Sequence, residues 1–261
     1  MGKMAERKNI IVGGCSCTAK SQPLTIYPKP LNFKMWPQLI SEMTDCNVIN
    51  TASNGCGNEQ IYYKVINEIF KHKKVDTVIV AWTEWTRQDF LTSDGWSSIV
   101  PTIRYEYHNN RPTFRKRPVF DELYLQKWYK QTFNKQYPSI ENIIQKNVIM
   151  FYSLYSICKE RNIKLKMFQM LRPVPQWLIK QDDADEYLRN AGYVMIKNPF
   201  INILNEKILW GWPCFSLIGG TSITQYLFKK NKWETISDVD GHPNEQTQKN
   251  IADLIHMETF L

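Results

Sequence analysis

The sequence predicts one α/β domain, a three-layer α/β/α sandwich around a central parallel sheet. Three short apolar runs alternate with two amphipathic helices over residues 1–81, and none of the runs alternates with polar residues as a half-exposed strand would. Strands covered by helices on both faces have this continuous apolar character, and parallel pairing needs a crossover between them. The 261 residues show no linker, low-complexity tract or repeat, so we expect a single domain over 1–261.

The elements of the N-terminal part follow from periodicity and turn residues. We expect strands over 8–12, 46–50 and 75–81, the first of which is closed by a Gly-Gly pair. A helix with proline in its first turn is expected over 36–43. A second helix begins at Asn58, which we expect to cap it, and keeps apolar residues at helical spacing. This order predicts right-handed crossovers within one sheet.

The C-terminal part is less regular. Residues 86–137 are rich in aromatic and basic side chains without a sustained period, and we expect an irregular insertion there. A helix is expected over 139–161, a strand over 163–171 and a terminal helix over 243–257. Between them, residues 208–210 are a candidate last strand, in a region that otherwise gives no clear pattern.

Composition narrows the classes of protein to consider. The hydrophobic fraction of 43% and charged fraction of 22% are ordinary for a globular domain. The N-terminus has no signal-peptide core and no apolar run is long enough to span a membrane, so we expect a soluble, cytoplasmic protein. The six scattered cysteines do not match a zinc pattern; we expect free thiols, and no metal or cofactor is implied. The net charge of +8 is compatible with a solvated surface or an anionic partner.

Three polar segments follow the expected N-terminal strands, and a fourth precedes the terminal helix. Ligands of parallel α/β sheets bind beyond the carboxyl ends of the strands, where such segments gather. We therefore expect the four to meet at one site. They are Gly14-Cys15-Ser16-Cys17-Thr18, the run from Asn50 to Asn58, Ala81-Trp82-Thr83-Glu84, and the run from Asp238 to Asn244.

In order and spacing, these segments resemble blocks I, II, III and V of the SGNH/GDSL hydrolases, over nearly the whole chain. The resemblance is closest to SGNH-like proteins encoded by marine bacteriophages, which carry Gly-Cys-Ser-x-Thr in block I, Trp-Thr followed by Arg in block III and Asp-Gly-His-Pro-Asn in block V. It implies a flavodoxin-like sandwich and a serine esterase that acts on an acylated small molecule or glycan. It also implies a phage-encoded protein in the host cytoplasm or associated with the virion. Its reaction class comes from the resemblance, because a fold alone does not define one.

The resemblance implies roles for a catalytic set. Ser16 would be the nucleophile, His242 the base that accepts its proton, and Asp240 or Asp238 the acid that orients the imidazole. The family's acid usually stands three residues before the histidine, where this chain has Val239. The alternatives are a turn serine at Ser16 and a turn-stabilising histidine at His242. The other histidines are interpreted as surface residues: His72, His108 and His256.

The same resemblance implies an oxyanion hole with one weakened position. The backbone N–H groups of Ser16 and Gly55 would donate to the oxyanion, although Gly55 is equally compatible with a simple turn. Thr83 replaces the block III asparagine, and its shorter hydroxyl would donate less well. Asn54 or Asn58 could supply the missing amide. In block I, Cys15 stands where the family has aspartate and is expected to pack.

Aromatic and basic residues near these segments are candidates for substrate binding. If the third strand ends at Ala81, tryptophans that follow it would surround the mouth of the site, where rings stack on sugars and Arg87 could bind a carboxylate or phosphate. The alternatives are that a tryptophan belongs to the core and that Arg87 pairs with Asp89. The tryptophan candidates are Trp82, Trp85, Trp210 and Trp212, and for the last two the sequence favours a packed turn over the lining of the site.

Two other functions remain open at this point. The substitutions at blocks I, III and V are compatible with a scaffold that has lost turnover and serves as a glycan-binding or structural phage module. Basic and aromatic residues interleaved over 104–137 would suit single-stranded nucleic acid, but no nucleic-acid motif frames them, and we rank this function last. The sequence does not indicate an oligomeric state.

Overall fold

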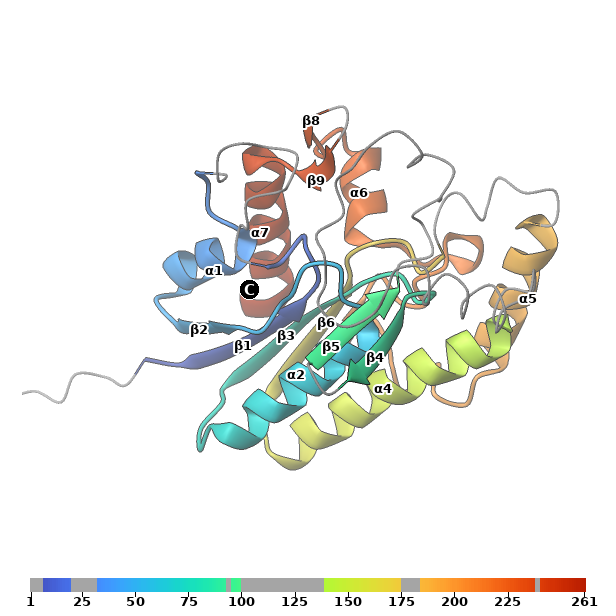
Figure 1. The fold of residues 1–261 in the computed structure, drawn as a ribbon, viewed down its shortest axis with the longest axis horizontal. Coiled ribbons are helices and arrows are strands. Elements are labelled where there is room, and N and C mark those ends of the chain that lie inside the picture. The colour runs from blue at the N-terminus through green and yellow to red at the C-terminus, as the bar shows by residue number, and fades with distance from the viewer. Residues whose placement is uncertain (1–6, 20–31, 93–94, 100–138, 175–183, 238–239) are drawn as a thin grey trace, which may run out of the picture.

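The computed structural model describes residues 7–19, 32–92, 95–99, 139–174, 184–237 and 240–261. Its central sheet has five parallel strands in the order β2-β1-β3-β6-β7 (Figure 1). The predicted α/β class with a central parallel sheet is therefore confirmed. The strands are β1 (Asn9–Gly14), β2 (Asn47–Asn50), β3 (Thr77–Trp82), β6 (Lys164–Gln169) and β7 (Leu209–Trp210).

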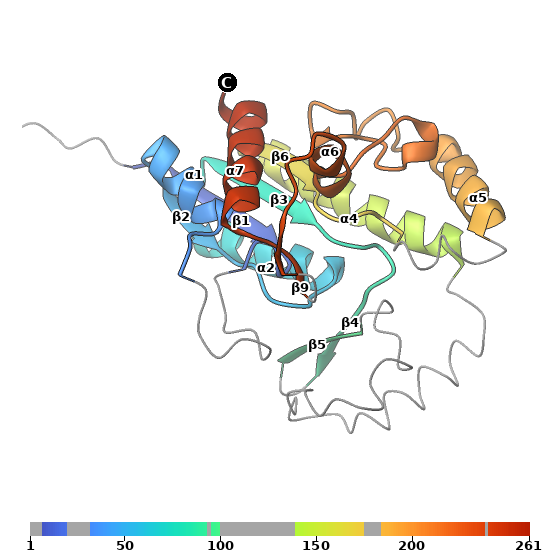
Figure 2. The ribbon, with the colours of Figure 1, turned by 90° about the horizontal axis from the view of Figure 1, so that it is seen from above.

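Helices cover both faces of this sheet. Along β3, Val78, Val80 and Trp82 face one core cluster, whereas Ile79 and Ala81 face the other, as expected for a strand buried on both sides. Figure 2 shows the two helical layers from above. The first cluster is covered by α2 (Asn58–Lys71), α4 (Ile140–Glu160) and α5 (Ala184–Lys197), and the second by α1 (Trp36–Thr44), α6 (Ile223–Lys229) and α7 (Glu245–Phe260).

Two hairpins and a short 3-10 helix lie outside the central sheet. The start of the expected irregular segment is an antiparallel hairpin of β4 (Gln88–Thr92) and β5 (Gly95–Ile99), which corrects that part of the prediction. Strands of five residues give too short a pattern to detect in a basic and aromatic stretch. The remainder of that segment, 100–138, lies outside the described residues. The other elements are β8 (Thr235–Ser237), β9 (Asp240–Pro243) and the 3-10 helix Ser216–Ile218.

The order of the strands creates a topological switch point at the carboxyl end of β1. From β1 the chain crosses to β2 on one side and then to β3 on the other, so the connections leave in opposite directions. Gly14 at the end of β1 is in register with Ala81 of β3, which brings the loops after these two strands together. Such a switch point is where open α/β sheets bind ligands.

The six cysteines are all buried free thiols, as predicted. Among the helices of the described residues, none has both the length and the apolar composition that crossing a membrane requires.

Candidate active site

The structure brings Ser16 and His242 into direct contact across 226 residues of sequence. The Nε2 atom of His242 lies 2.9 Å from the Oγ atom of Ser16, which is hydrogen-bonding distance. Both residues are half-buried, so the pair is reachable from solvent while being held by its surroundings. This is the arrangement in which an imidazole can accept a serine proton.

A tight turn after β1 presents Ser16. The carbonyl oxygen of Cys15 accepts hydrogen bonds from the N–H groups of Thr18 and Ala19, each at 2.9 Å. Within 10–19, Ser16 alone is not buried, because the turn directs its neighbours inward. A Cβ atom on Gly14 would lie 2.3 Å from the Thr18 hydroxyl, so the strand must end in glycine for the turn to close.

Neighbouring elements hold this turn in place. The side chain of Asn50, at the end of β2, donates to the Thr18 carbonyl at 2.8 Å. From α7, the amide of Gln248 donates to the Cys17 carbonyl at 3.3 Å. The turn that carries Ser16 is therefore bonded to both the sheet and the terminal helix.

His242 is positioned by the β8–β9 hairpin and the start of α7. Asn244 caps α7 by accepting from the Thr247 N–H at 2.9 Å, and its own N–H donates to the Glu234 carbonyl at 3.1 Å. Asp240 belongs to β9, two residues before His242, but the described residues do not include its side chain. Asp238 lies outside the described residues.

The loop after β2 runs beside the end of β1. The N–H of Thr51 donates to the Val12 carbonyl at 2.9 Å, and that of Ser53 donates to the Gly14 carbonyl at 3.2 Å. Gly55 has φ of 71°, a left-handed conformation that favours glycine, and Asn54 beside it is half-buried. Within the described part of the chain, the Ser16 and Gly55 N–H groups donate to no protein acceptor, and both residues are half-buried.

Asn58 and Thr83 are both committed to the interior. Asn58 is the first residue of α2 and not its cap, which is Gly57. The amide of Asn58 accepts from the Thr83 N–H at 2.9 Å and donates to Asn147 at 2.7 Å. The Thr83 hydroxyl is fully buried beside the Cys15 thiol and has no oxygen or nitrogen partner among the described residues. Neither side chain is therefore placed to donate into the site.

Trp82 and Trp85, at the end of β3 and just after it, belong to the core. Trp82 is the last residue of β3, is fully buried and stacks on Phe151 with ring centroids 4.5 Å apart. Trp85 is buried as well and donates to the Gln169 side chain at 2.9 Å. The strand runs one residue further than Ala81, so these rings pack inward instead of surrounding the mouth of the site.

The remaining two tryptophans form the packed turn after β7. Trp210 is buried in this strand, and the indole of Trp212 donates to the Ile201 carbonyl at 2.8 Å. Gly211 between them has φ of 75°, and a Cβ there would lie 2.4 Å from the Thr221 carbonyl oxygen. The structure thus places both in the packed turn that the sequence favours for them.

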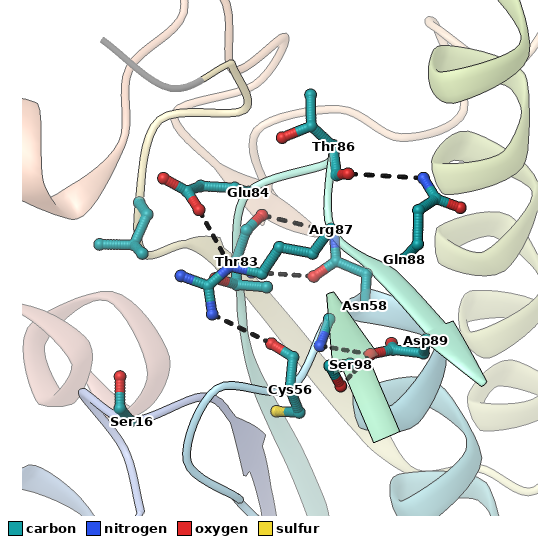
Figure 3. Close-up of polar contacts among 12 residues, drawn as sticks. Ser16, Cys56, Asn58, Thr83, Glu84, Thr86, Arg87, Gln88, Asp89 and Ser98 are labelled. Carbon is teal, nitrogen blue, oxygen red and sulfur yellow. Dashed lines mark hydrogen bonds and ion pairs between the residues drawn. The ribbon is translucent and has the colours of Figure 1, made fainter. Parts of the chain in front are cut away.

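Arg87 lies over the end of the sheet and pairs with Glu84, not with Asp89. Its Nε donates to Glu84 at 2.9 Å and its Nη1 donates to the Cys56 carbonyl at 3.2 Å (Figure 3). The side chains of Arg87 and Glu84 are only 9% and 12% exposed. Burial raises the pKa of Glu84, and the nearby Arg87 charge offsets only part of that effect. Glu84 was not a candidate from sequence, although an acid three residues before a base was a usable signal.

Asp89 has a separate role at the start of α2. Its carboxylate accepts from the N–H of Gly57 at 2.7 Å and from that of Gln60 at 2.8 Å. It also accepts a hydrogen bond from the Ser98 hydroxyl. A carboxylate from β4 therefore caps α2, immediately after the loop that holds Gly55.

Two buried thiols flank the nucleophile turn. A hydrogen bond from Cys17 lowers the pKa of the Cys15 thiol well below its usual value, against the effect of burial, and the Arg87 charge lowers it further. The pKa of the Cys17 thiol is raised, first by that same hydrogen bond and then by burial. Arg87 therefore lies close enough to the residue before Ser16 to interact with it electrostatically.

Among the described residues, no group of three or more His, Cys, Asp or Glu side chains is arranged to hold a metal ion. His72 is 39% exposed and contacts Glu68, whereas His256 is half-buried against Phe260. His108 lies outside the described residues.

Comparison with known proteins adds no assignment. No model of a known protein family matches the chain, and no curated protein matches it.

Proposed function

We propose that the protein is a serine hydrolase of the SGNH type that cleaves small acyl esters through Ser16 and His242. The contact of 2.9 Å between Ser16 Oγ and His242 Nε2 is the observation that carries this proposal. It joins the turn after the first strand to the hairpin before the last helix, the two segments that the family resemblance pairs. Separate structural roles for a turn serine and a turn histidine would not by themselves require this contact.

The chemistry follows from the geometry of the pair. His242 accepts the Ser16 proton as Oγ attacks the ester carbonyl, and the carbonyl electron pair moves to oxygen. The N–H groups of Ser16 and Gly55 would donate to this oxyanion. The imidazolium then gives its proton to the leaving alkoxide, which leaves an acyl-enzyme that water hydrolyses by the same steps. Asp240 or Asp238 would orient His242 in this scheme.

The acceptor of the acyl group comes from the family resemblance and not from the geometry of the site. An acylated small molecule or a glycan follows from the resemblance, as does a location in the host cytoplasm or virion. The aromatic support for a sugar is lost because Trp82, Trp85 and Trp210 are buried. We therefore propose small acyl esters as the substrate class, with a glycan as one form of the acceptor.

A scaffold without turnover is the second candidate, and one observation favours it. Thr83 directs its hydroxyl into the core and its N–H to Asn58, so the third block supplies no donor from this position. Such a protein would keep the Ser16–His242 contact as a binding or structural feature.

Hydrolysis of p-nitrophenyl acetate separates the two candidates. We expect wild-type turnover that falls by at least about a thousandfold in Ser16→Ala and in His242→Ala, because each change removes a group that the mechanism uses directly. Circular dichroism of both variants would check that the fold is kept. A folded wild-type protein with no turnover above the Ser16→Ala background would instead support the binding or structural module.

A further inference from the structure

We propose that Arg87 is a catalytic residue whose guanidinium donates a hydrogen bond to the oxyanion, in place of the amide that the third block lacks. The inference rests on the proposed function and adds a group to its machinery. When the Ser16 oxygen bonds to the ester carbon, the carbonyl electron pair moves to oxygen. Arg87 and the backbone N–H groups would together stabilise this negative charge by hydrogen bonds.

Thr83, the residue expected to donate a hydrogen bond to the oxyanion, does not donate one. Thr83 has a fully buried hydroxyl beside Cys15, and its N–H is bonded to Asn58 at 2.9 Å. The Asn58 amide in turn is bonded to Asn147, so it has no group to offer the site. Neither side chain therefore supplies a third donor, and Arg87 belongs to the same loop as Thr83.

Two hydrogen bonds hold the Arg87 guanidinium, and its Nη2 group is left for another acceptor. Glu84 accepts from its Nε, and the Cys56 carbonyl accepts from its Nη1. Its Nη2 donates to no acceptor within the described residues, although the side chain is only 9% exposed. A guanidinium has five N–H groups in a rigid fork, so fixing two of them orients the others.

The Arg87 guanidinium is oriented toward the end of the sheet that carries Ser16. Figure 3 shows the Arg87 side chain folded back over Thr83, with its guanidinium directed toward the part of the sheet end where the Ser16 hydroxyl projects. The bond to the Cys56 carbonyl fixes it against the residue that follows Gly55. Arg87 also acts electrostatically on Cys15, which precedes Ser16. The guanidinium therefore lies among the groups expected to surround the oxyanion.

Glu84 makes such a donor compatible with burial. A lone buried cation is costly, whereas a paired guanidinium keeps its donors and adds little net charge. A preorganised donor aimed at developing charge acts without reorganisation during the reaction, which is the property an oxyanion hole requires. The charge of Glu84 weakens the attraction of this cation to any anion, whether an oxyanion or an anionic substituent of the substrate. Esters that differ in the charge of the acyl group distinguish these two partners of Arg87.

Two esters test this assignment in the full-length protein. Wild type, Arg87→Gln and Arg87→Lys would be assayed with p-nitrophenyl acetate, which is neutral, and with mono-p-nitrophenyl succinate, whose acyl group is anionic. For Arg87→Gln we expect kcat to fall about a hundredfold or more on both esters with KM nearly unchanged, because the lost interaction is made in the transition state. Arg87→Lys would retain the charge but lose the fork, so we expect at least a tenfold fall in kcat.

Lys166→Gln is the matched control, because it also removes a buried cation, one that pairs with Glu258 at 3.7 Å. A fall in kcat no larger than in this control would show that Arg87 is structural, and a loss confined to the succinate ester would show that it binds the substrate's anion; either overturns the proposal. If Arg87→Gln does not fold, wild-type kcat in Arg87→Lys overturns it. A folded wild-type protein without esterase activity would instead contradict the proposed function, and the role of Arg87 that rests on it.

Discussion

At the scale of single residues, Ser16 differs from its neighbours in being the one accessible side chain of a buried turn. The family resemblance predicted its contact with His242, because it assigns these residues to the first and last of four short segments. Residues whose position depends on where a strand ends were harder to predict. Trp82 and Trp85 were placed at the site only by ending β3 at Ala81, and one further residue of strand puts them in the core.

Asn58 shows how much of the site's frame depends on one amide. It joins α2 to the loop after β3 and to α4 through Thr83 and Asn147. We expect Asn58→Ala to lower the free energy of unfolding by about 2 to 5 kcal/mol, because a buried N–H and a buried amide oxygen lose their partners. Urea denaturation would measure it. Asn250→Ala is the control, since that exposed amide donates only to the Lys232 carbonyl and its loss should cost less than about 1 kcal/mol. Equal effects would contradict the network.

At the scale of elements, the β4–β5 hairpin is bonded to the helix that follows the Gly55 loop. The carboxylate of Asp89 accepts from Gly57 and Gln60 at the N-terminus of α2, and Ser98 of β5 donates to it. A Cβ on Gly57 would lie 2.7 Å from that carboxylate. Capping by a residue 29 to 32 positions away cannot be deduced from local signals, which is why the sequence placed the cap at Asn58.

Removing this carboxylate should destabilise the protein through α2. We expect Asp89→Ala to lower the free energy of unfolding by about 2 to 4 kcal/mol, because two N–H groups at the helix start lose a charged acceptor. Thermal or urea unfolding would report it. Asp45→Asn offers a comparison, because that carboxylate is 78% exposed, pairs with the exposed Arg7 and should contribute less than about 1 kcal/mol. Asparagine is used there because Asp45 has φ of 49°, a left-handed conformation that asparagine tolerates better than alanine. A result for Asp89→Ala as small as for Asp45→Asn would show that α2 does not depend on the cap.

At the scale of the whole molecule, the sheet order explains why the site lies where it does. The crossover from β1 to β2 and the return to β3 place three polar loops at one end of β1, and α7 brings the β8–β9 hairpin to the same place. The first 81 residues carried enough periodicity to predict this architecture. The part from 176 onward did not, since β7 has two residues and β8 three, which is below the length at which a hydrophobic pattern is recognisable.

The most direct test of the central claim is covalent labelling with a fluorophosphonate, followed by intact mass and peptide mapping. An activated serine attacks this probe and an ordinary serine does not, because attack needs a base to remove the hydroxyl proton. We predict one label per chain, located on Ser16, absent in Ser16→Ala and strongly slowed in His242→Ala. A folded wild-type protein that takes up no label, or takes it up elsewhere than on Ser16, would contradict it.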